Sequence, residues 1–289
     1  MTRVAYLGPE GSFSEEAARL QYGSEGEYIS FPDIPAAIAA LSHKLVDNAV
    51  VPIENSIEGS INVTLDHLLH SESPPPIVAE LNLPVRHHLV ARPGTGLSQI
   101  ERVVSIPAAV AQCRQFLQEQ LPQVQVLAAL STSAAVQSLV HSGNIAAIGN
   151  QRAAQLYGME IVVEDIQDTS DNVTRFIALN HTPSVPTGID KTSIALILAA
   201  DKPGSLMSML REFADRDINL SKIESRPTRT GMGKYFFLID LAGHQGDSIV
   251  AEALEGARQH SDKLLILGSY PAAAKAPGLS KPAAPTVQE

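Results

Sequence analysis

Short apolar segments alternate with helical patterns through the first 180 residues, and this alternation restricts the fold more than any other feature. It favours a parallel, layered α/β arrangement, because each helix covers a face of the sheet that the strands build. In residues 35–46 and 108–121 apolar residues recur at helical spacing, which predicts two helices. The predicted strands are residues 3–7, 48–53, 103–105, 124–127, 146–148 and 173–179.

A proline-rich run, Ser-Glu-Ser-Pro-Pro-Pro at residues 71–76, divides this region because it cannot continue a helix. Residues 80–92 then have the pattern of extended chain that crosses into a second lobe, and the chain returns near residues 165–171. We therefore expect one lobe from approximately residues 1–78 and 166–182, and another from residues 79–165. Two lobes joined by crossing strands form a cleft, and clefts of this kind bind small ligands.

A second domain is expected after the polar linker at residues 180–188, which carries two prolines. Beyond the linker the pattern is βαββαβ, the order of a ferredoxin-like unit. From residue 271 onward the chain is rich in Ala, Pro, Lys and Ser, which predicts a disordered tail. The expected elements are strand 191–200, helix 205–216, strand 218–226, strand 234–242, helix 248–258 and strand 264–270.

The composition argues against several partner classes. The formal net charge of −10 offers no general attraction to nucleic-acid phosphates, although convergent donors in an enclosed site still bind an anionic substrate. The single cysteine, Cys113, excludes an internal disulfide, fits a reducing cytosol and is expected to be buried. We find neither an apolar run of about 18 residues nor an export signal, so we expect a cytoplasmic protein that does not contact membranes.

Residues 171–176, Asp-Asn-Val-Thr-Arg-Phe, place a hydroxyl and a cation in an otherwise apolar strand. Side chains alternate across a strand, so Thr174 and Arg175 are expected on opposite faces. An arginine in a buried strand needs a carboxylate partner or an anionic ligand, because an unpaired buried charge is too costly. These residues alone leave two interpretations open: a ligand site, or an ordinary strand whose arginine pairs with a structural acid.

Four strand-to-helix junctions carry polar side chains, and together they are compatible with one anion site between the lobes. Ser12 and Glu15 have the spacing of a capping box, which predicts that a helix starts there. A serine at such a junction is by itself most often a helix cap. The four junctions lie in residues 8–15, 52–60, 105–112 and 131–135.

The junction at residues 52–60 has the richest set of polar groups. Glu54, Asn55 and Ser56 follow a buried strand, and a helix is expected to begin near Ser60. Placing so many hydrogen-bonding groups at the end of a buried strand is costly unless they serve a ligand or a turn. This segment therefore favours a ligand site.

The histidines do not form a recognisable metal site. His87 and His88 lie in apparent extended chain and so point to opposite faces. His67 and His70 have a helical spacing that is compatible with a metal, but no cysteine or acidic cluster accompanies them. We expect solvated or capped histidines and no metal.

Five segments occur in the order and spacing of the prephenate dehydratase catalytic domain, and the chain resembles that family: GPEGSFSEEAA, PIENS-x-x-GS, S-x-P-x-A-x-x-QC, STSAA and NVTRF. Residues 219–227 resemble the ACT regulatory domain of the family, in which Glu-Ser-Arg-Pro accompanies phenylalanine binding. The likeness covers residues 3 to 270. Two positions depart from the family pattern: Ile106 stands where histidine is usual, and Ser205 stands where alanine is usual.

The resemblance implies a cofactor-free lyase that converts prephenate to phenylpyruvate in phenylalanine biosynthesis, by decarboxylative dehydration. Thr174 would hydrogen bond to the leaving ring hydroxyl and either protonate it or relay a proton. A buried, protonated Glu54 is the expected proton source, and Arg175 either clamps a substrate carboxylate or pairs with a structural acid. Substrate contacts are expected from Ser12, Asn55, Ser56, Gly59, Ser105, Gln112, Ser133, Asn172 and Phe176.

The resemblance also implies a domain arrangement and an effector. A two-lobed, periplasmic-binding-protein-like catalytic domain would occupy residues 1–182, and an ACT domain would occupy residues 187–270. Phenylalanine is expected to inhibit through the ACT domain, and pairing of such domains predicts self-association as a dimer or tetramer. The expected phenylalanine contacts are Asp201, Pro203, Gly204, Ser205, Leu206, Asn219, Leu220, Glu224, Ser225 and Arg226.

Two alternative functions remain open at this stage. Arogenate differs from prephenate only in having an amino group in place of the side-chain keto group, and motif spacing does not distinguish the two substrates. Two α/β lobes around a cleft also describe solute-binding proteins and the effector domains of transcription regulators. Such proteins normally bring an export signal or a helix-turn-helix segment, and the sequence shows neither.

Overall fold

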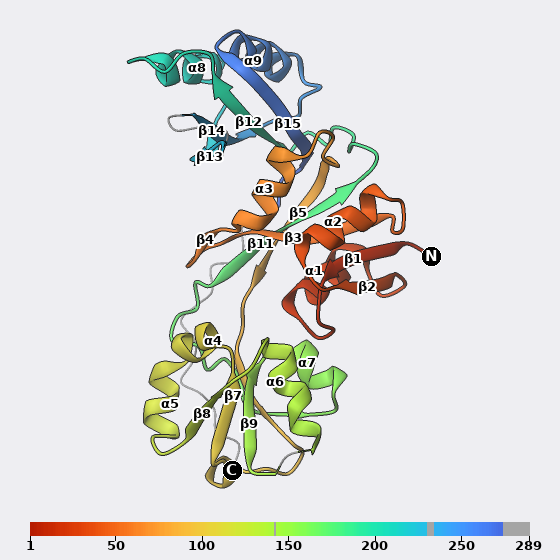
Figure 1. The fold of residues 1–289 in the computed structure, drawn as a ribbon, viewed down its shortest axis with the longest axis vertical. Helices are drawn as coiled ribbons and strands as arrows, with labels where there is room; N and C mark the ends of the chain where they lie inside the picture. Colours follow the sequence, from red (N-terminus) through yellow and green to blue (C-terminus); the bar gives the residue numbers. More distant parts are fainter. Residues whose placement is uncertain (142, 230–233, 274–289) are drawn as a thin grey trace. The chain divides into compact units, whose positions relative to one another are not determined.

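The structure, a computed structural model, describes residues 1–141, 143–229 and 234–273 (Figure 1). Contacts divide the chain into two compact units, residues 1–64 with 81–176 and residues 65–80 with 177–273. The tail predicted at residues 271–289 lies outside the described residues from residue 274 onward. Among the described residues, no helix has the length and apolar character that a membrane span requires.

The N-terminal sheet confirms the predicted α/β alternation. It contains β1 (Arg3–Leu7), β2 (Glu27–Phe31), β3 (Asn48–Asn55), β4 (Gly59–Ser60), β5 (Ile77–Pro84) and β11 (Val173–Asn180). The order is β2-β1-β3-β11-β5, with β4 paired to β3, and β1 runs parallel to both of its neighbours. Its helices are α1 (Phe13–Tyr22), α2 (Ile34–Ser42) and α3 (Asn62–His70).

A second sheet of five strands has the order β10-β6-β9-β7-β8. These strands are β6 (His88–Ala91), β7 (Arg102–Ser105), β8 (Gln125–Ala128), β9 (Ile145–Gly149) and β10 (Glu160–Val163). Separate apolar clusters bury Leu89 and Ile148 in one group and Val90 and Ala147 in another, as alternation along β6 and β9 requires. The helical segments are η1 (Leu97–Gln99), α4 (Pro107–Gln112), α5 (Arg114–Gln120), α6 (Thr132–Ser138), η2 (Leu139–His141) and α7 (Gln151–Leu156).

The C-terminal sheet is antiparallel, with the order β13-β14-β12-β15 that a ferredoxin-like unit requires. Its elements are β12 (Asp190–Leu198), α8 (Ser205–Ala214), β13 (Leu220–Pro227), β14 (Tyr235–Ala242), α9 (Ser248–Gln259) and β15 (Ser261–Pro271). Both helices cover one face of this sheet (Figure 1). Their buried side chains Met209, Phe213 and Leu254 pack with Ile194 and Ile239 of the strands. The predicted βαββαβ unit is confirmed.

Residues 65–80 belong to the same unit as this domain, and two contacts explain the grouping. The Glu80 side chain is 1% exposed and accepts from the Lys191 ammonium at 2.7 and 2.9 Å. Gly268 has φ +153°, and a Cβ at this residue would lie 2.2 Å from the Ile77 carbonyl oxygen. A side chain at position 268 would therefore separate β15 from the segment at Ile77.

The helix predicted at residues 108–121 is two helices, α4 and α5, that meet at Cys113 (φ −117°, ψ 23°). Asp168 explains the break. Its N–H donates to the Gln112 carbonyl at 2.6 Å, and its Oδ1 accepts from the Gln115 N–H at 3.0 Å. Asp168 thereby ends one helix and caps the next, while Cys113 stays buried as expected.

Of two other predicted helix boundaries, one is wrong and one is confirmed. The helix predicted at 35–46 ends at Ser42, because Lys44 takes φ +57° and the Leu45 N–H turns back to the Ala40 carbonyl at 2.9 Å. The helix expected to begin near Ser60 begins at Asn62, because Ser60 itself lies in β4 and pairs with Glu54 of β3.

Candidate active site

The first unit contains a cleft of about 570 Å³ whose lining brings together much of the predicted site. Asn55 lies at the end of β3, Asn172 lies just before β11 and Thr174 within it, and Gln112 ends α4. His87 enters the lining from the segment between β5 and β6. Apolar walls come from Phe13, Ile61, Val85, Ile106, Ala108 and Ala109.

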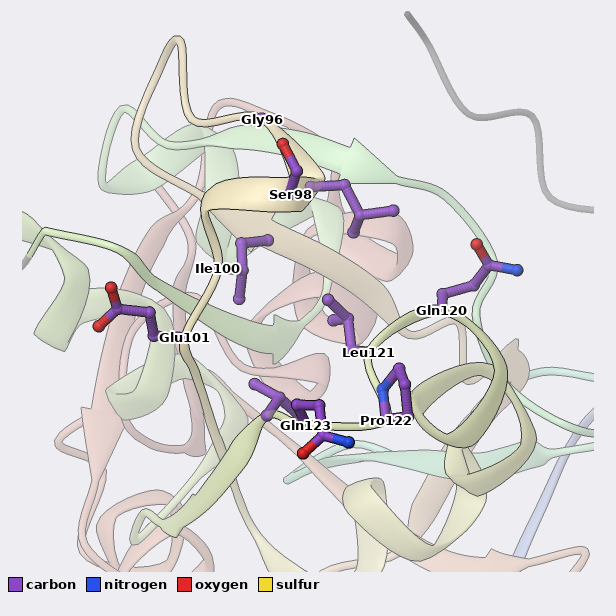
Figure 2. Close-up of a pocket in the computed structure, with 10 residues that line it drawn as sticks. Gly96, Ser98, Ile100, Glu101, Gln120, Leu121, Pro122 and Gln123 are labelled. Atoms are coloured by element: carbon purple, nitrogen blue, oxygen red, sulfur yellow. The ribbon is translucent and has the colours of Figure 1, made fainter.

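A larger hollow of about 720 Å³ lies away from this cleft, between η1 and the end of α5 (Figure 2). Leu97, Ile100, Leu121 and Val124 line it, and none of the predicted site residues does. We place the functional site in the smaller cleft, because a site is identified by convergent polar groups in an enclosed space and not by volume alone.

Five cleft side chains form one continuous series of hydrogen bonds. His87 Nε2 lies 3.0 Å from Gln112 Oε1, which also accepts from Asn172 Nδ2 at 2.8 Å. Asn172 Oδ1 in turn accepts from Asn55 Nδ2 at 2.8 Å. The same Asn55 nitrogen donates to Thr174 Oγ1 at 3.0 Å. Groups from four separate parts of the sequence thus meet in one network.

The turn after β3 fixes the orientation of Asn55. Its Oδ1 accepts from the N–H groups of Ile57 at 2.9 Å and Glu58 at 3.0 Å. Two backbone donors leave no doubt about which end of this amide is the oxygen, so Nδ2 faces Asn172 and Thr174. The Thr174 oxygen therefore receives a hydrogen bond from Asn55, and the Thr174 hydroxyl proton is available to another acceptor.

Thr174 and Arg175 face opposite ways, as strand alternation predicts. The Arg175 side chain is 12% exposed, and its Nη1 lies 3.5 Å from Glu54 Oε2. The cleft-lining residues that the structure describes include Thr174 but neither Arg175 nor Glu54. The geometry therefore corrects the expected proton transfer from Glu54 to Thr174: Glu54 forms an ion pair with Arg175, and Asn55 is the partner of Thr174.

All four predicted substrate serines donate hydrogen bonds to backbone carbonyls, and none of them appears among the described residues that line the cleft. Ser12 Oγ donates to the Leu7 carbonyl at 3.0 Å and accepts from the Glu15 N–H at 3.3 Å. Ser56 Oγ donates to the Asp171 carbonyl at 2.6 Å, and Ser105 Oγ donates to the Ile148 carbonyl at 2.8 Å. Ser133 Oγ donates to the Glu10 carbonyl. Their hydroxyls therefore stabilise the backbone at the strand-to-helix junctions, which is the structural role that we considered most common for a serine at such a junction.

The remaining predicted substrate residues divide in the same way. Asn55, Gly59, Gln112 and Asn172 line the cleft, whereas Phe176 is 2% exposed within the core. The capping box is only half formed, because the Glu15 carboxylate accepts from Gly11 N–H at 2.5 Å and not from Ser12.

The expectation of solvated or capped histidines is wrong for His87 and His88, which are 4% and 7% exposed. They do face different partners: His87 contacts Gln112, whereas His88 Nδ1 accepts from the Asp165 N–H at 3.0 Å. Burial lowers the pKa of the His87 imidazole, and its hydrogen bond to Gln112 opposes this only in part. His87 was not among the predicted site residues. It lies in the segment predicted to cross between the lobes, and that position was the one feature of the sequence that pointed to the cleft.

Among the described residues, no group of three or more His, Cys, Asp or Glu side chains is placed to hold a metal ion. His70, one of the pair with helical spacing, contacts the Asp66 carbonyl through Nδ1 at 2.9 Å and the Thr228 carbonyl through Nε2 at 3.1 Å.

Glu15 gives the first unit an acid-sensitive contact. Its Oε1 lies 2.6 Å from Arg19 Nε and 2.9 Å from Arg152 Nη2, and its side chain is 2% exposed. Burial raises the pKa of this carboxyl, but the Gly11 N–H and the two guanidinium groups outweigh burial and lower the pKa from its ordinary value of 4.5.

A carboxyl whose pKa is lower in the folded than in the unfolded protein stabilises the fold above the unfolded value, and this contribution is lost as the pH falls through the folded value. We therefore expect the urea midpoint of unfolding to decrease below pH 4.5. Glu15→Gln should lower the midpoint at pH 7 and flatten its dependence on acid pH. An unchanged slope in the variant would contradict this assignment.

The fold and the cleft together define a class of protein: a two-lobed α/β protein with a polar cleft, followed by a ferredoxin-like domain. The protein-family model for prephenate dehydratase matches residues 4–184, and the family model for the ACT domain matches residues 193–259. The chain belongs to the prephenate dehydratase family.

Individual relatives agree with this assignment. The chain is 37% identical to the prephenate dehydratase of Bacillus subtilis, over 93% of this chain and 98% of the relative. It is also similar to a crystal structure of prephenate dehydratase in complex with L-Phe from Arthrobacter aurescens, with a TM-score of 0.85, 39% identity and coverage of 97% of this chain and 93% of the other. A structure described as a quorum quenching acylase has a TM-score of 0.84 at 27% identity, covering 93% of this chain and 98% of the other.

Proposed function

We propose that the chain is a prephenate dehydratase that converts prephenate to phenylpyruvate with loss of water and carbon dioxide. The observation that carries this proposal is the Asn55 hydrogen bond to Thr174 Oγ1, which leaves the Thr174 hydroxyl proton free to point into the cleft and away from the protein network. The direct test is to incubate the protein with prephenate and follow phenylpyruvate by its absorbance in alkali. Well-folded protein without turnover would favour a binding module instead.

Departure of the ring hydroxyl is the step that needs assistance, since the aromatic ring of the product supplies the driving force. Thr174 keeps its proton and donates a hydrogen bond through it to the leaving oxygen, which departs as hydroxide and takes its second proton from solvent, and Asn55 polarises the Thr174 hydroxyl by donating to Oγ1. A threonine is a weak acid, so this contribution is hydrogen-bond stabilisation by a preorganised donor. The rest of the catalysis comes from positioning the substrate.

Prephenate carries two carboxylates, and we infer that neutral donors hold them. The described residues that line the cleft include no lysine and no arginine, and Glu58 is the one acidic residue among them. Arg175 is paired with Glu54, so the structural interpretation of this arginine is favoured over a direct substrate clamp. Preorganised N–H and O–H groups bind anions well in an enclosed site because they need no reorganisation when the charge arrives.

Arogenate remains the alternative substrate, because it shares the ring, the ring carboxylate and the leaving hydroxyl. The two compounds differ at the side-chain keto or amino group. Comparing kcat/KM for the two substrates in direct competition measures the difference in transition-state binding and decides between them.

We further propose that phenylalanine inhibits the enzyme through the C-terminal domain. Gly204, with φ +89°, precedes α8 and brings no side chain to cap its first turn, which leaves room for an amino-acid carboxylate. Asp201, Pro203, Ser205 and Leu206 surround this turn. The other proposed contacts come from Asn219, just before β13, and from Leu220, Glu224, Ser225 and Arg226 within β13.

The ion pair of Arg226 links the proposed phenylalanine site to helix α3. Its Nη2 lies 2.8 Å from Asp66 Oδ1 on α3, and Asp66 Oδ2 lies 2.7 Å from Arg229 Nη2. The helix α3 begins at Asn62, which lines the cleft. The proposed effector strand therefore contacts a helix whose first residue belongs to the substrate site.

Asp66→Asn is expected to raise the phenylalanine concentration for half-inhibition by about fivefold or more, the lower range of a typical allosteric coupling. The uninhibited kcat should change little. The measurement is prephenate turnover against phenylalanine concentration, with Asp47→Asn, which removes an ion pair to Arg3, as the control. Unchanged inhibition in Asp66→Asn would place the coupling elsewhere.

We propose that the protein is at least a dimer. Within the described residues β13 and β15 are the two edge strands of the C-terminal sheet, and exposed edges readily pair with another chain. Sedimentation at micromolar concentration tests this, and a single 30.8 kDa species would contradict it.

A further inference from the structure

The histidine at one end of the cleft network has no role in the mechanism described so far. His87 is 4% exposed and packs edge-on against Phe13, with ring centroids 5.9 Å apart. Its Nε2 contacts Gln112 Oε1, whereas the described residues give the buried Nδ1 no hydrogen-bond partner. Buried polar atoms without partners are rare and call for an explanation.

The network assigns a tautomer to this imidazole. The backbone donors of Ile57 and Glu58 fix the Asn55 amide, so Asn172 must present Oδ1 to Asn55 and Nδ2 to Gln112. Gln112 then presents Oε1, and the His87 nitrogen that faces it must be the donor. The proton of the neutral imidazole therefore sits on Nε2.

The unpaired Nδ1 agrees with this assignment. In the Nε2–H tautomer Nδ1 is an acceptor without a partner, whereas in the other tautomer it would be a buried N–H without an acceptor, which folded proteins tolerate less. Burial also lowers the pKa of His87, which favours the neutral ring.

We propose that His87 is a positioning residue for the dehydration: its Nε2–H holds the Gln112 amide, so that the series of amides donates into Thr174 Oγ1 and leaves the Thr174 proton directed at the substrate. This role rests on the proposed function. Gln112 Oε1 would otherwise lose one of its two donors, and its amide could rotate away from Asn172. The chemistry at Thr174 is thus sensitive to a ring that acts only through its neighbours.

Two substitutions separate hydrogen bonding from packing. His87→Gln keeps an N–H donor that can face Gln112, whereas His87→Leu keeps an apolar side chain without a donor. We expect His87→Leu to lower kcat by about tenfold or more with KM within threefold, because loss of orientation acts on the reacting geometry. His87→Gln should recover most of kcat. His88→Gln, which removes a buried histidine outside the cleft network, is the control.

A double-mutant cycle tests the route of the effect. If His87 acts only through Thr174, His87→Leu should cause little further loss of kcat in a Thr174→Val background. The proposal would be overturned if the kcat losses of His87→Leu and Thr174→Val multiplied in the double variant. It would also be overturned if His87→Leu and His87→Gln were equally impaired, or if His87→Leu were fully active.

Nitrogen-15 NMR of the wild-type histidines supplies a readout that does not depend on turnover. The His87 resonances, identified by their absence in His87→Gln, should report a neutral Nε2–H ring between pH values of about 6 and 8. An Nδ1–H ring or an imidazolium would overturn the assignment. Absence of prephenate turnover in the wild type would instead reject the proposed function and leave the tautomer result standing.

Discussion

Thr174→Val is expected to lower kcat for prephenate by roughly 10²–10³-fold, the usual range for loss of one preorganised hydrogen-bond donor to a developing charge, with a much smaller change in KM. Valine has nearly the shape of threonine and suits a strand, so the substitution removes the hydroxyl and leaves the packing of β11. Asn55 keeps its hydrogen bond to Asn172 in this variant. Steady-state formation of phenylpyruvate measures the effect.

Thr174→Ser is the matched control, because it restores a hydroxyl that can accept from Asn55 and donate to the substrate. It should retain most of the wild-type kcat. Urea unfolding of both variants shows whether the fold persists. A decrease of less than tenfold in a well-folded Thr174→Val protein would contradict the role given to this residue.

Local patterns in the sequence predicted well where the side chains at the centre of the cleft lie. Strand alternation places Thr174 in the cleft and Arg175 with Glu54 on the other face. The polar junction after β3 brings Asn55 beside Asn172, because β3 and β11 are neighbours in the sheet. These predictions succeed because the period of a strand and the ends of neighbouring strands are encoded locally.

Predictions that depended on distant partners were less successful. A serine at a junction looks the same whether it binds a ligand or a carbonyl, and Ser105 and Ser133 bind carbonyls of Ile148 and Glu10. The break at Cys113 has no local signal, since it is made by Asp168, far along the chain. Two strands, β2 and β10, were not predicted. Both lie at a sheet edge, and neither has the long apolar run that identifies a central strand.

Lys191→Met is expected to lower the free energy of unfolding by roughly 3–5 kcal/mol, because it leaves a buried carboxylate without its cation. Lys191 donates to both oxygens of Glu80, whose side chain is 1% exposed. The Ala273 N–H still reaches Glu80 Oε1 at 2.9 Å, so the loss should fall in the lower part of this range. Methionine retains the length of the lysine stem, which keeps its packing.

The Glu80→Gln and Lys191→Met double variant isolates the charge. Removing both partners replaces the ion pair by neutral groups, so the double variant should regain most of the stability that Lys191→Met loses. Lys222→Met serves as the comparison, because its partner Glu224 is 26% exposed and also pairs with Arg226, so losing Lys222 leaves no buried carboxylate without a cation and should cost less than losing Lys191. Urea unfolding of the four proteins measures these differences. If Lys191→Met were no less stable than Lys222→Met, the buried pair would not be what holds residues 65–80 to the C-terminal domain.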